Sequence, residues 1–133
     1  MSATADGKPK VLVFFTTSCG RTKNFLKNLN REYEDFSSVD ILFIETRKAK
    51  EFAVKTFRNN YALPEMNFAY DYSNNAKNAM SAYTKKFLPK VKTVNTPLIV
   101  FIDENNNVQE VIHGKALTMP EFKKIIDKSV LRK

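Results

Sequence analysis

The sequence predicts an α/β domain in which a mixed sheet is flanked by helices. Three observations indicate this class. Short, wholly apolar runs such as residues 11–15 and 98–102 suit strands that are buried on both faces of a sheet. Segments with apolar residues at helical spacing follow several of these runs, and turn-forming residues 103–107 separate the last two predicted strands. The 133 residues, 43% of them hydrophobic, suit one domain.

The first half of the chain predicts a strand–helix–strand–helix unit. After the strand at 11–15, a helix is expected to run to about residue 38, followed by a second buried strand at 39–45. Thr46 is expected to open another helix, which ends before Pro64. Connections of this kind give neighbouring parallel strands joined by right-handed crossovers. The expected inward faces are Phe25, Leu26, Leu29, Tyr33 and Phe36 in the first helix, and Ala49, Phe52, Ala53, Thr56 and Phe57 in the second.

The second half predicts a short edge strand at 66–72 and a helix capped by residues 73–75 and ended by Pro89. An antiparallel hairpin of strands 98–102 and 108–112 follows. Residues 118–121 match a capping box, which predicts a last helix. The expected inward faces are Ala76, Ala79, Met80, Tyr83, Phe87 and Leu88 in the first of these helices, and Phe122, Ile125, Ile126 and Val130 in the last.

Cys19, the only cysteine, is expected where the first strand gives way to the first helix. The amides that begin a helix carry partial positive charge, which favours the thiolate over the thiol, and Arg21 and Lys23 add two cations. The alternative is an inert core thiol, since free cysteine is often buried. The polar residues 16–18 before it favour an exposed, reactive sulfur.

Cys19-Gly20-Arg21-Thr22 resembles the active-site loop of the thioredoxin superfamily, whose usual form is Cys-Gly-Pro-Cys. The predicted order of elements over nearly all of residues 10–131 is also similar to the thioredoxin-like fold. The resemblance implies that Cys19 is the nucleophile and that Thr22 stands in the place of the resolving cysteine. Gly20 and Arg21 would help to contact the substrate.

The resemblance extends to Thr96-Pro97, which precedes the strand at 98–102. It implies that this peptide bond is cis, lies against the sulfur and pairs with an extended substrate backbone. A domain over 10–133 is expected from this match, and the small polar residues near the start suggest a disordered tail over 1–9. The helical insertion at 66–92, before the cis-proline strand, is similar to the redoxin branch, which includes bacterial envelope thiol–disulfide oxidoreductases.

Three departures from this pattern limit the expected chemistry. Thr22 cannot close an intramolecular disulfide, Val13 replaces a buried acid of the first strand, and the chain has no tryptophan beside the motif. A hydroxyl at Thr22 would still stabilise a thiolate by hydrogen bonding. The lone His113 is a weak candidate for proton transfer to the Cys19 loop, and its alternative is a partly exposed structural residue.

The main hypothesis is therefore a monothiol exchange protein that acts on protein thiols and disulfides and needs an external thiol, such as glutathione, for release. The alternative is a redox-silent binding module that uses the groove beside Thr96-Pro97. The net charge of +8 leaves binding to an anionic surface or nucleic acid as a third reading, but no nucleic-acid motif accompanies it.

Composition excludes several other classes of site. One cysteine and one histidine argue against a zinc site, and three scattered glycines against a phosphate-binding loop. No apolar run approaches the length of a membrane span. A monomer is expected, with a Cys19-linked dimer on oxidation. A cytoplasmic protein is expected if Met1 is the native start, and a bacterial envelope protein if a leader has been removed.

Overall fold

The computed structural model describes residues 8–47, 50–69 and 75–131. Its elements follow one another as β1 (Lys10–Phe15), α1 (Gly20–Glu32), a 3₁₀ turn (Tyr33–Phe36), β2 (Asp40–Glu45), α2 (Glu51–Tyr61), β3 (Asn67–Ala69), α3 (Asn75–Phe87), β4 (Leu98–Ile102), β5 (Val108–His113), α4 (Met119–Ile125) and a π-helical turn (Ile126–Leu131).

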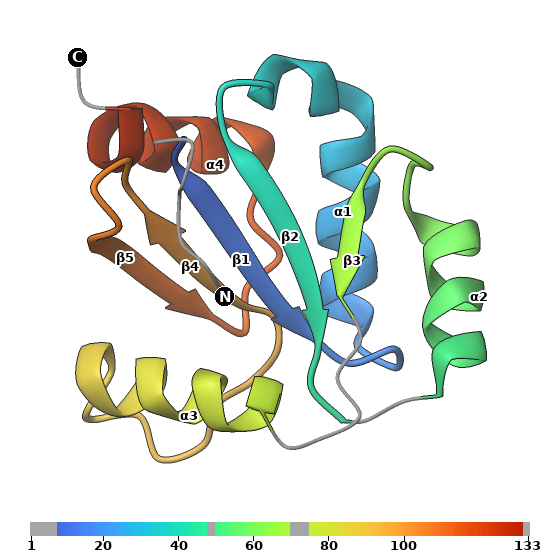
Figure 1. The fold of residues 1–133 in the computed structure, drawn as a ribbon, viewed down its shortest axis with the longest axis horizontal. Coiled ribbons are helices and arrows are strands. Elements are labelled where there is room, and N and C mark those ends of the chain that lie inside the picture. Colours follow the sequence, from blue (N-terminus) through green and yellow to red (C-terminus); the bar gives the residue numbers. More distant parts are fainter. Residues whose placement is uncertain (1–7, 48–49, 70–74, 132–133) are drawn as a thin grey trace.

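A single five-stranded sheet, in the order β3-β2-β1-β4-β5, forms the centre of the molecule (Figure 1). β1 pairs with β2 in parallel, and β2 with β3 in parallel. β4 is antiparallel to both β1 and β5. The predicted mixed sheet, with a parallel front half and an antiparallel hairpin, is confirmed.

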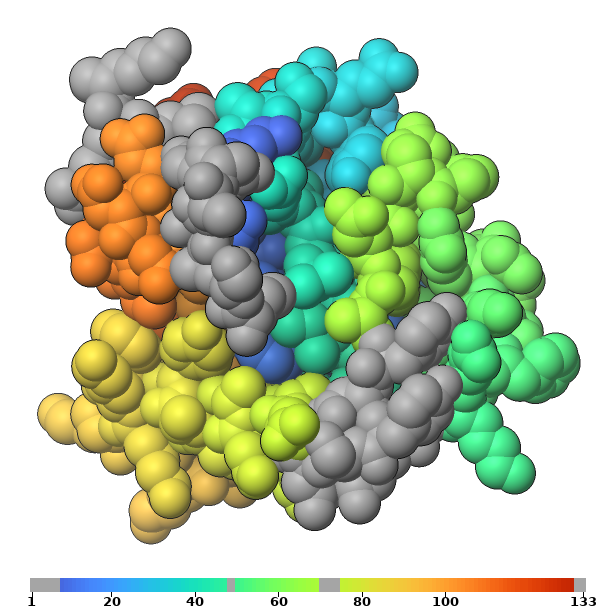
Figure 2. All heavy atoms as spheres, viewed as in Figure 1, coloured from blue at the N-terminus to red at the C-terminus, as the bar shows by residue number. Residues whose placement is uncertain are grey.

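Alternate residues of the central strands face two separate clusters. Val11, Val13 and Phe15 belong to the larger cluster, into which α1, α2 and α4 pack. Leu12 and Phe14 belong to the smaller one, which α3 covers. Helices therefore pack on both faces of the sheet, and this explains why β1 and β4 read as continuous apolar runs. Figure 2 shows α3 and the segment after it over the lower part of the viewed face.

Aromatic rings make up much of the larger cluster. Phe122 of α4 contacts the rings of Phe25 in α1, Phe36 in the 3₁₀ turn and Phe101 in β4, at centroid distances of 5.3, 4.9 and 5.7 Å. These edge-on and tilted arrangements are the ones that aromatic pairs favour. They lock the last helix against the first.

Local signals in the second half of the chain are confirmed as well. The hairpin turn places Asn106 at a φ of 67°, and the Asp103 carboxylate accepts hydrogen bonds of 2.9 Å from the N–H groups of Asn105 and Asn107. The predicted capping box is present at the start of α4, where Thr118 and Glu121 hydrogen-bond reciprocally.

The second helix differs from its prediction. α2 begins at Glu51 rather than Thr46, because Thr46 stays in line with β2: its N–H and its hydroxyl both donate to the Phe15 carbonyl, at 3.0 and 3.2 Å. Phe52, expected in the core, is 79% exposed. Thr56, also expected inward, is exposed. The side of α2 that faces the sheet carries Phe57, as predicted, together with Val54.

Phe87, also expected in the core, is 36% exposed in the last turn of α3. Its ring lies 6.5 Å from that of Tyr83, and Tyr83 rather than Phe87 packs on the smaller cluster. Helical spacing predicted the correct face of α3. It could not show that the last turn of the helix, which carries Phe87, extends past the cluster.

Several further predictions lie wholly or partly outside the described residues. Residues 1–7 of the expected tail, Ala49, residues 70–72 of the expected edge strand and residues 73–74 of the expected helix cap are not described. Pro9, at the end of that tail, is buried, and its carbonyl accepts a hydrogen bond of 2.9 Å from the N–H of Asp40.

Candidate functional site

Cys19 lies where the turn after β1 meets the first residue of α1, as predicted. Its N–H donates to the Thr16 carbonyl at 3.1 Å, and its own carbonyl accepts from the N–H of Lys23 at 3.2 Å. The cysteine thus closes a short turn and at the same time caps the helix with its backbone. Its side chain is partly exposed rather than enclosed in the core.

The sulfur faces the Thr96–Pro97 peptide, which comes 77 residues later in the chain. The Cys19 thiol donates to the Thr96 carbonyl at 3.3 Å. The Thr96–Pro97 bond is cis, as expected from the resemblance. Pairing of β1 with β4 brings the two loops together, because Phe14 lies opposite Leu98 at the end of that ladder.

Gly114 holds the peptide from the other side. Its N–H donates to the Pro97 carbonyl at 3.0 Å, and its backbone has a φ of 65°. A Cβ at this position would lie 2.9 Å from the Cβ of Asn95. Only glycine fits both the backbone angle and the space, so Gly114 helps to shape the loop around Thr96.

Burial and hydrogen bonding act on the Cys19 thiol in opposite directions. Burial, the largest single influence, raises its pKa, but hydrogen bonds from the Thr22 and Thr96 side chains and from the N–H groups of Thr22 and Arg21 outweigh it. The net effect is a pKa of Cys19 below its ordinary value of 9.0. The donors at the helix start stabilise the thiolate.

Thr22 places a buried hydroxyl group near Cys19. It lies in the first turn of α1 and is fully buried, and its Oγ1 has no hydrogen-bond partner among the described residues. The same side chain is one of the groups that lower the pKa of Cys19. A thiolate at Cys19 would give this buried donor an acceptor.

The other predicted site residues lie around this centre. Gly20 opens α1, is exposed and has open space beside its Cα. Arg21 is exposed on the same turn. His113 lies at the end of β5, where its Nδ1 accepts a hydrogen bond of 3.3 Å from the N–H of Asn95. Among the described residues it has no hydrogen bond or ion pair to Cys19.

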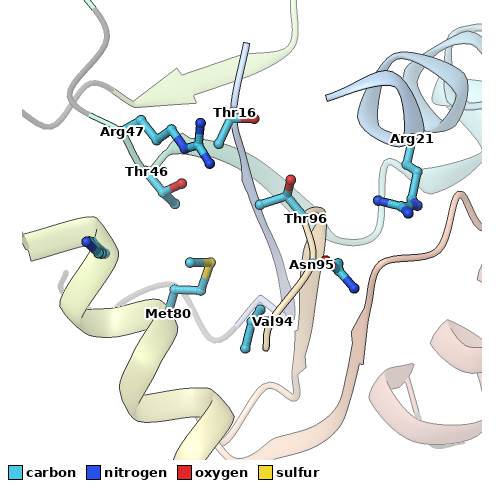
Figure 3. Close-up of a pocket in the computed structure, with 9 residues that line it drawn as sticks. Thr16, Arg21, Thr46, Arg47, Met80, Val94, Asn95 and Thr96 are labelled. Carbon is cyan, nitrogen blue, oxygen red and sulfur yellow. The ribbon is translucent and has the colours of Figure 1, made fainter. Parts of the chain in front are cut away.

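A cavity of about 560 Å³ is lined by residues that neighbour Cys19 in the fold, although Cys19 itself does not line it (Figure 3). Thr16 and Thr96, both hydrogen-bonded to Cys19, form part of its wall. Arg21 lines it from α1, and Arg47 and Lys77 from beyond β2 and from α3. In Figure 3 the Arg47 side chain extends towards Thr16, and Arg21 extends towards Asn95 and Thr96.

Arg47 and Lys77 were not among the residues predicted to belong to the site. Arg47 comes two residues after a buried strand, at the edge where parallel strands end and sites commonly form, and this position could have marked it. Lys77 had no such signal, because only the packing of α3 across that edge brings it to the cavity. Glu45 was also missed: it is buried at the end of β2, where its carboxylate accepts a hydrogen bond of 2.9 Å from the N–H of Arg47.

Among the described residues, no group of three or more His, Cys, Asp or Glu side chains is placed to hold a metal ion. The described helices include none with the length and apolar character of a membrane span.

The family model for the AhpC/TSA family matches residues 1–111. The chain belongs to the AhpC/TSA family. A search of curated proteins gives no significant match.

Solved structures match this AhpC/TSA family member over most of its length. A thioredoxin-like protein from Aeropyrum pernix superposes with a TM-score of 0.67 and 18% identity, over 95% of this chain and 81% of the other. StoA from Bacillus subtilis gives 0.66 and 16%, over 96% and 88%. A secreted Mycobacterium tuberculosis disulfide oxidoreductase, described as homologous to E. coli DsbE, gives 0.61 and 20%, over 89% and 78%. These similarities show that the fold is thioredoxin-like.

Proposed function

We propose that the protein exchanges thiols and disulfides through Cys19 acting alone. The observation that carries this proposal is the environment of the Cys19 sulfur. The side chain is partly exposed, its pKa is lowered, and the buried Thr22 hydroxyl, which has no other partner among the described residues, could donate a hydrogen bond to the thiolate. Membership of the AhpC/TSA family and the thioredoxin-like fold support it. Gly20, Arg21, Thr96 and Pro97 would border the substrate, and His113 stays a weak candidate for proton transfer.

The first step is attack of the Cys19 thiolate on one sulfur of a substrate disulfide. The substrate S–S bond breaks, a mixed disulfide forms at Cys19, and the other substrate sulfur leaves as a thiolate that takes a proton from solvent. Arg21 and Thr22 N–H groups lose their charged acceptor at this point, so the same contacts favour Cys19 as a later leaving group.

Release needs a second thiol from outside the chain. Thr22, on the first turn of the helix, has no sulfur with which to attack the mixed disulfide. An external thiolate such as glutathione attacks the substrate sulfur or the Cys19 sulfur, a new disulfide forms, and one thiolate is released. In the absence of such a thiol, oxidation would link two copies through Cys19, whereas the reduced protein would be a monomer.

The test is the fate of a disulfide-containing peptide incubated with the reduced protein. A mixed disulfide at Cys19, seen by mass spectrometry and released as the peptide thiol by added glutathione, is the expected result. Cys19→Ser is the control and should give neither species. A parent protein that reacts no faster than a free cysteine in an unfolded peptide would refute the proposal.

The second candidate is a redox-silent module that binds extended peptides beside Thr96–Pro97. The presence of only one cysteine favours it, because no internal disulfide cycle can run. Peptide binding that is equally strong in the parent and in Cys19→Ser, without mixed disulfide formation, would support this candidate instead.

A further inference from the structure

The cavity beside Cys19 is lined by positive charge from three separate parts of the chain. Arg21 comes from α1, Arg47 from the segment after β2 and Lys77 from α3. No Asp or Glu side chain is among the residues found to line it. Its volume of about 560 Å³ falls in the range of about 300–1,000 Å³ that is usual for small-molecule sites.

Some of the other described basic residues meet a carboxylate. Lys115 pairs with Glu121 at 2.6 Å, and Lys123 lies 3.5 Å from Asp35. Arg21, Arg47 and Lys77 form no ion pair with any residue that the structure describes. Three unpaired cations around one concave surface create a positive potential that attracts anions.

One buried carboxylate stands behind the cavity wall. Glu45 is 1% exposed and accepts from the main-chain N–H of Arg47, so one acidic side chain lies next to the segment that carries Arg47. It is a single group against three cations. A ligand in the cavity still meets an excess of positive charge together with the hydroxyl-bearing side chains of Thr16 and Thr46, which are 8% and 6% exposed.

Two residues of the cavity wall hydrogen-bond to Cys19. Thr16 accepts a hydrogen bond from the Cys19 N–H at 3.1 Å, and Thr96 accepts one from the Cys19 thiol at 3.3 Å. A small molecule held against these two threonines would have its own sulfur beside that of Cys19. Carboxylates on such a ligand could meet Arg47 and Lys77, which also line the cavity.

We propose that this cavity binds the external thiol that completes exchange at Cys19, and that it selects a small thiol bearing carboxylates. This inference rests on the proposed function and names the class of its co-substrate. In the bound state, the Cys19 thiolate attacks the disulfide of the anionic molecule. One S–S bond breaks, the Cys19 mixed disulfide forms, and the second sulfur leaves as a thiolate that is protonated by solvent. In the opposite direction, the reduced molecule releases Cys19 from the same mixed disulfide.

The first experiment compares two disulfides at low salt. Oxidised glutathione carries carboxylates, and hydroxyethyl disulfide carries no charge; the rate of mixed disulfide formation at Cys19 is measured for each by mass spectrometry. The double variant Arg47→Gln/Lys77→Gln should lower the ratio of the two rates by about tenfold, since each cation within roughly 6 Å of a carboxylate changes its binding about threefold in water. The ratio removes any general change in Cys19 reactivity.

Lys124→Gln/Lys128→Gln is the matched control, because it removes two positive charges from exposed positions at the C-terminal end, on the face opposite α3. Its ratio should equal that of the parent. Equal ratios in all three proteins would overturn the inference while leaving monothiol exchange intact. A ratio that falls as far in the control would also overturn it, because net charge rather than the cavity would then be responsible.

A second measurement does not depend on Cys19 chemistry. The Cys19→Ser protein is titrated with S-methylglutathione, which is anionic but cannot exchange, and amide shifts are followed by NMR. Saturable shifts at Thr16, Thr46 and Lys77 that weaken with added salt are expected. Absence of saturable binding would overturn the cavity assignment. An unreactive Cys19 in the parent alongside saturable binding would refute exchange but leave the anion site standing.

Discussion

Replacing Thr22 with valine should make Cys19 less reactive and, at pH values where Cys19 is a thiol, make the fold more stable. The two effects have one cause. The Thr22 hydroxyl is buried without a partner beside the thiol, and it becomes a donor to the thiolate. Valine has nearly the same shape as threonine and has no hydroxyl. It therefore removes the cost of an unsatisfied hydroxyl beside the thiol, and it also removes the hydrogen bond that would stabilise the thiolate.

The size of each effect follows from the burial of the two side chains. An unsatisfied buried hydroxyl costs about 1–3 kcal/mol, which the valine variant should recover in part as unfolding free energy. A hydrogen bond to a charged acceptor contributes about 1.5–3 kcal/mol. Because Cys19 is partly exposed, water also solvates its thiolate, and the lower limit applies. A loss of about 1.4 kcal/mol reduces the thiolate fraction at neutral pH about tenfold.

The assay is the rate of alkylation by iodoacetamide as a function of pH, read by mass spectrometry, with urea unfolding measured in parallel. Thr22→Val should shift the alkylation profile to higher pH and slow the reaction at neutral pH about tenfold. Thr22→Ser keeps the hydroxyl and should retain the parent profile, although the lost methyl group lowers stability. A valine profile that coincides with the parent would refute the role given to this hydroxyl.

The pH dependence of the unfolding free energy is a second, independent test of the lowered Cys19 pKa. Because the fold lowers the pKa of Cys19 below its ordinary value of 9.0, the native state releases this proton at a lower pH than the unfolded chain does. The resulting stability is fully present above pH 9.0 and is lost as pH falls through the lower, native pKa. In Thr22→Val the native pKa rises, so stability should increase less between neutral pH and that limit.

Three more outcomes are expected. Thr22→Cys should form a reversible intramolecular disulfide with Cys19, detected as loss of both thiols on oxidation, and persistent free thiols would contradict the match to the active-site loop. Gly114→Ala should lower the unfolding free energy by about 1–3 kcal/mol, because its backbone has a φ of 65° and the new Cβ would lie 2.9 Å from that of Asn95; an unchanged urea midpoint would show that the loop can shift. Glu121, whose pKa is lowered from 4.5 to about 2 chiefly by the Lys115 ammonium, should contribute stability that is present above pH 4.5 and lost as pH falls to about 2; Glu121→Gln should remove that part of the acid slope, and an identical slope would contradict it.

Much of the fold could be predicted from local sequence. The apolar runs of β1 and β4 and the capping box at the start of α4 each specify their own structure within a few residues, and all three are confirmed. The second helix shows the limit of this reasoning. Its spacing placed Phe52 inward, but the side chain is 79% exposed. The spacing of apolar residues does not show which part of a helix is covered by the sheet.

The sequence by itself determined that one sulfur would lie at a strand-to-helix junction, since the elements on both sides of Cys19 are strongly patterned. The resemblance added the expected Thr96–Pro97 contact. Only the tertiary structure decided that the Thr22 hydroxyl would be buried without a partner and that Arg21, Arg47 and Lys77 would surround one cavity. Those arrangements depend on how separate elements cross at one end of the sheet, and no local pattern of residues encodes a distance between side chains so far apart in the chain.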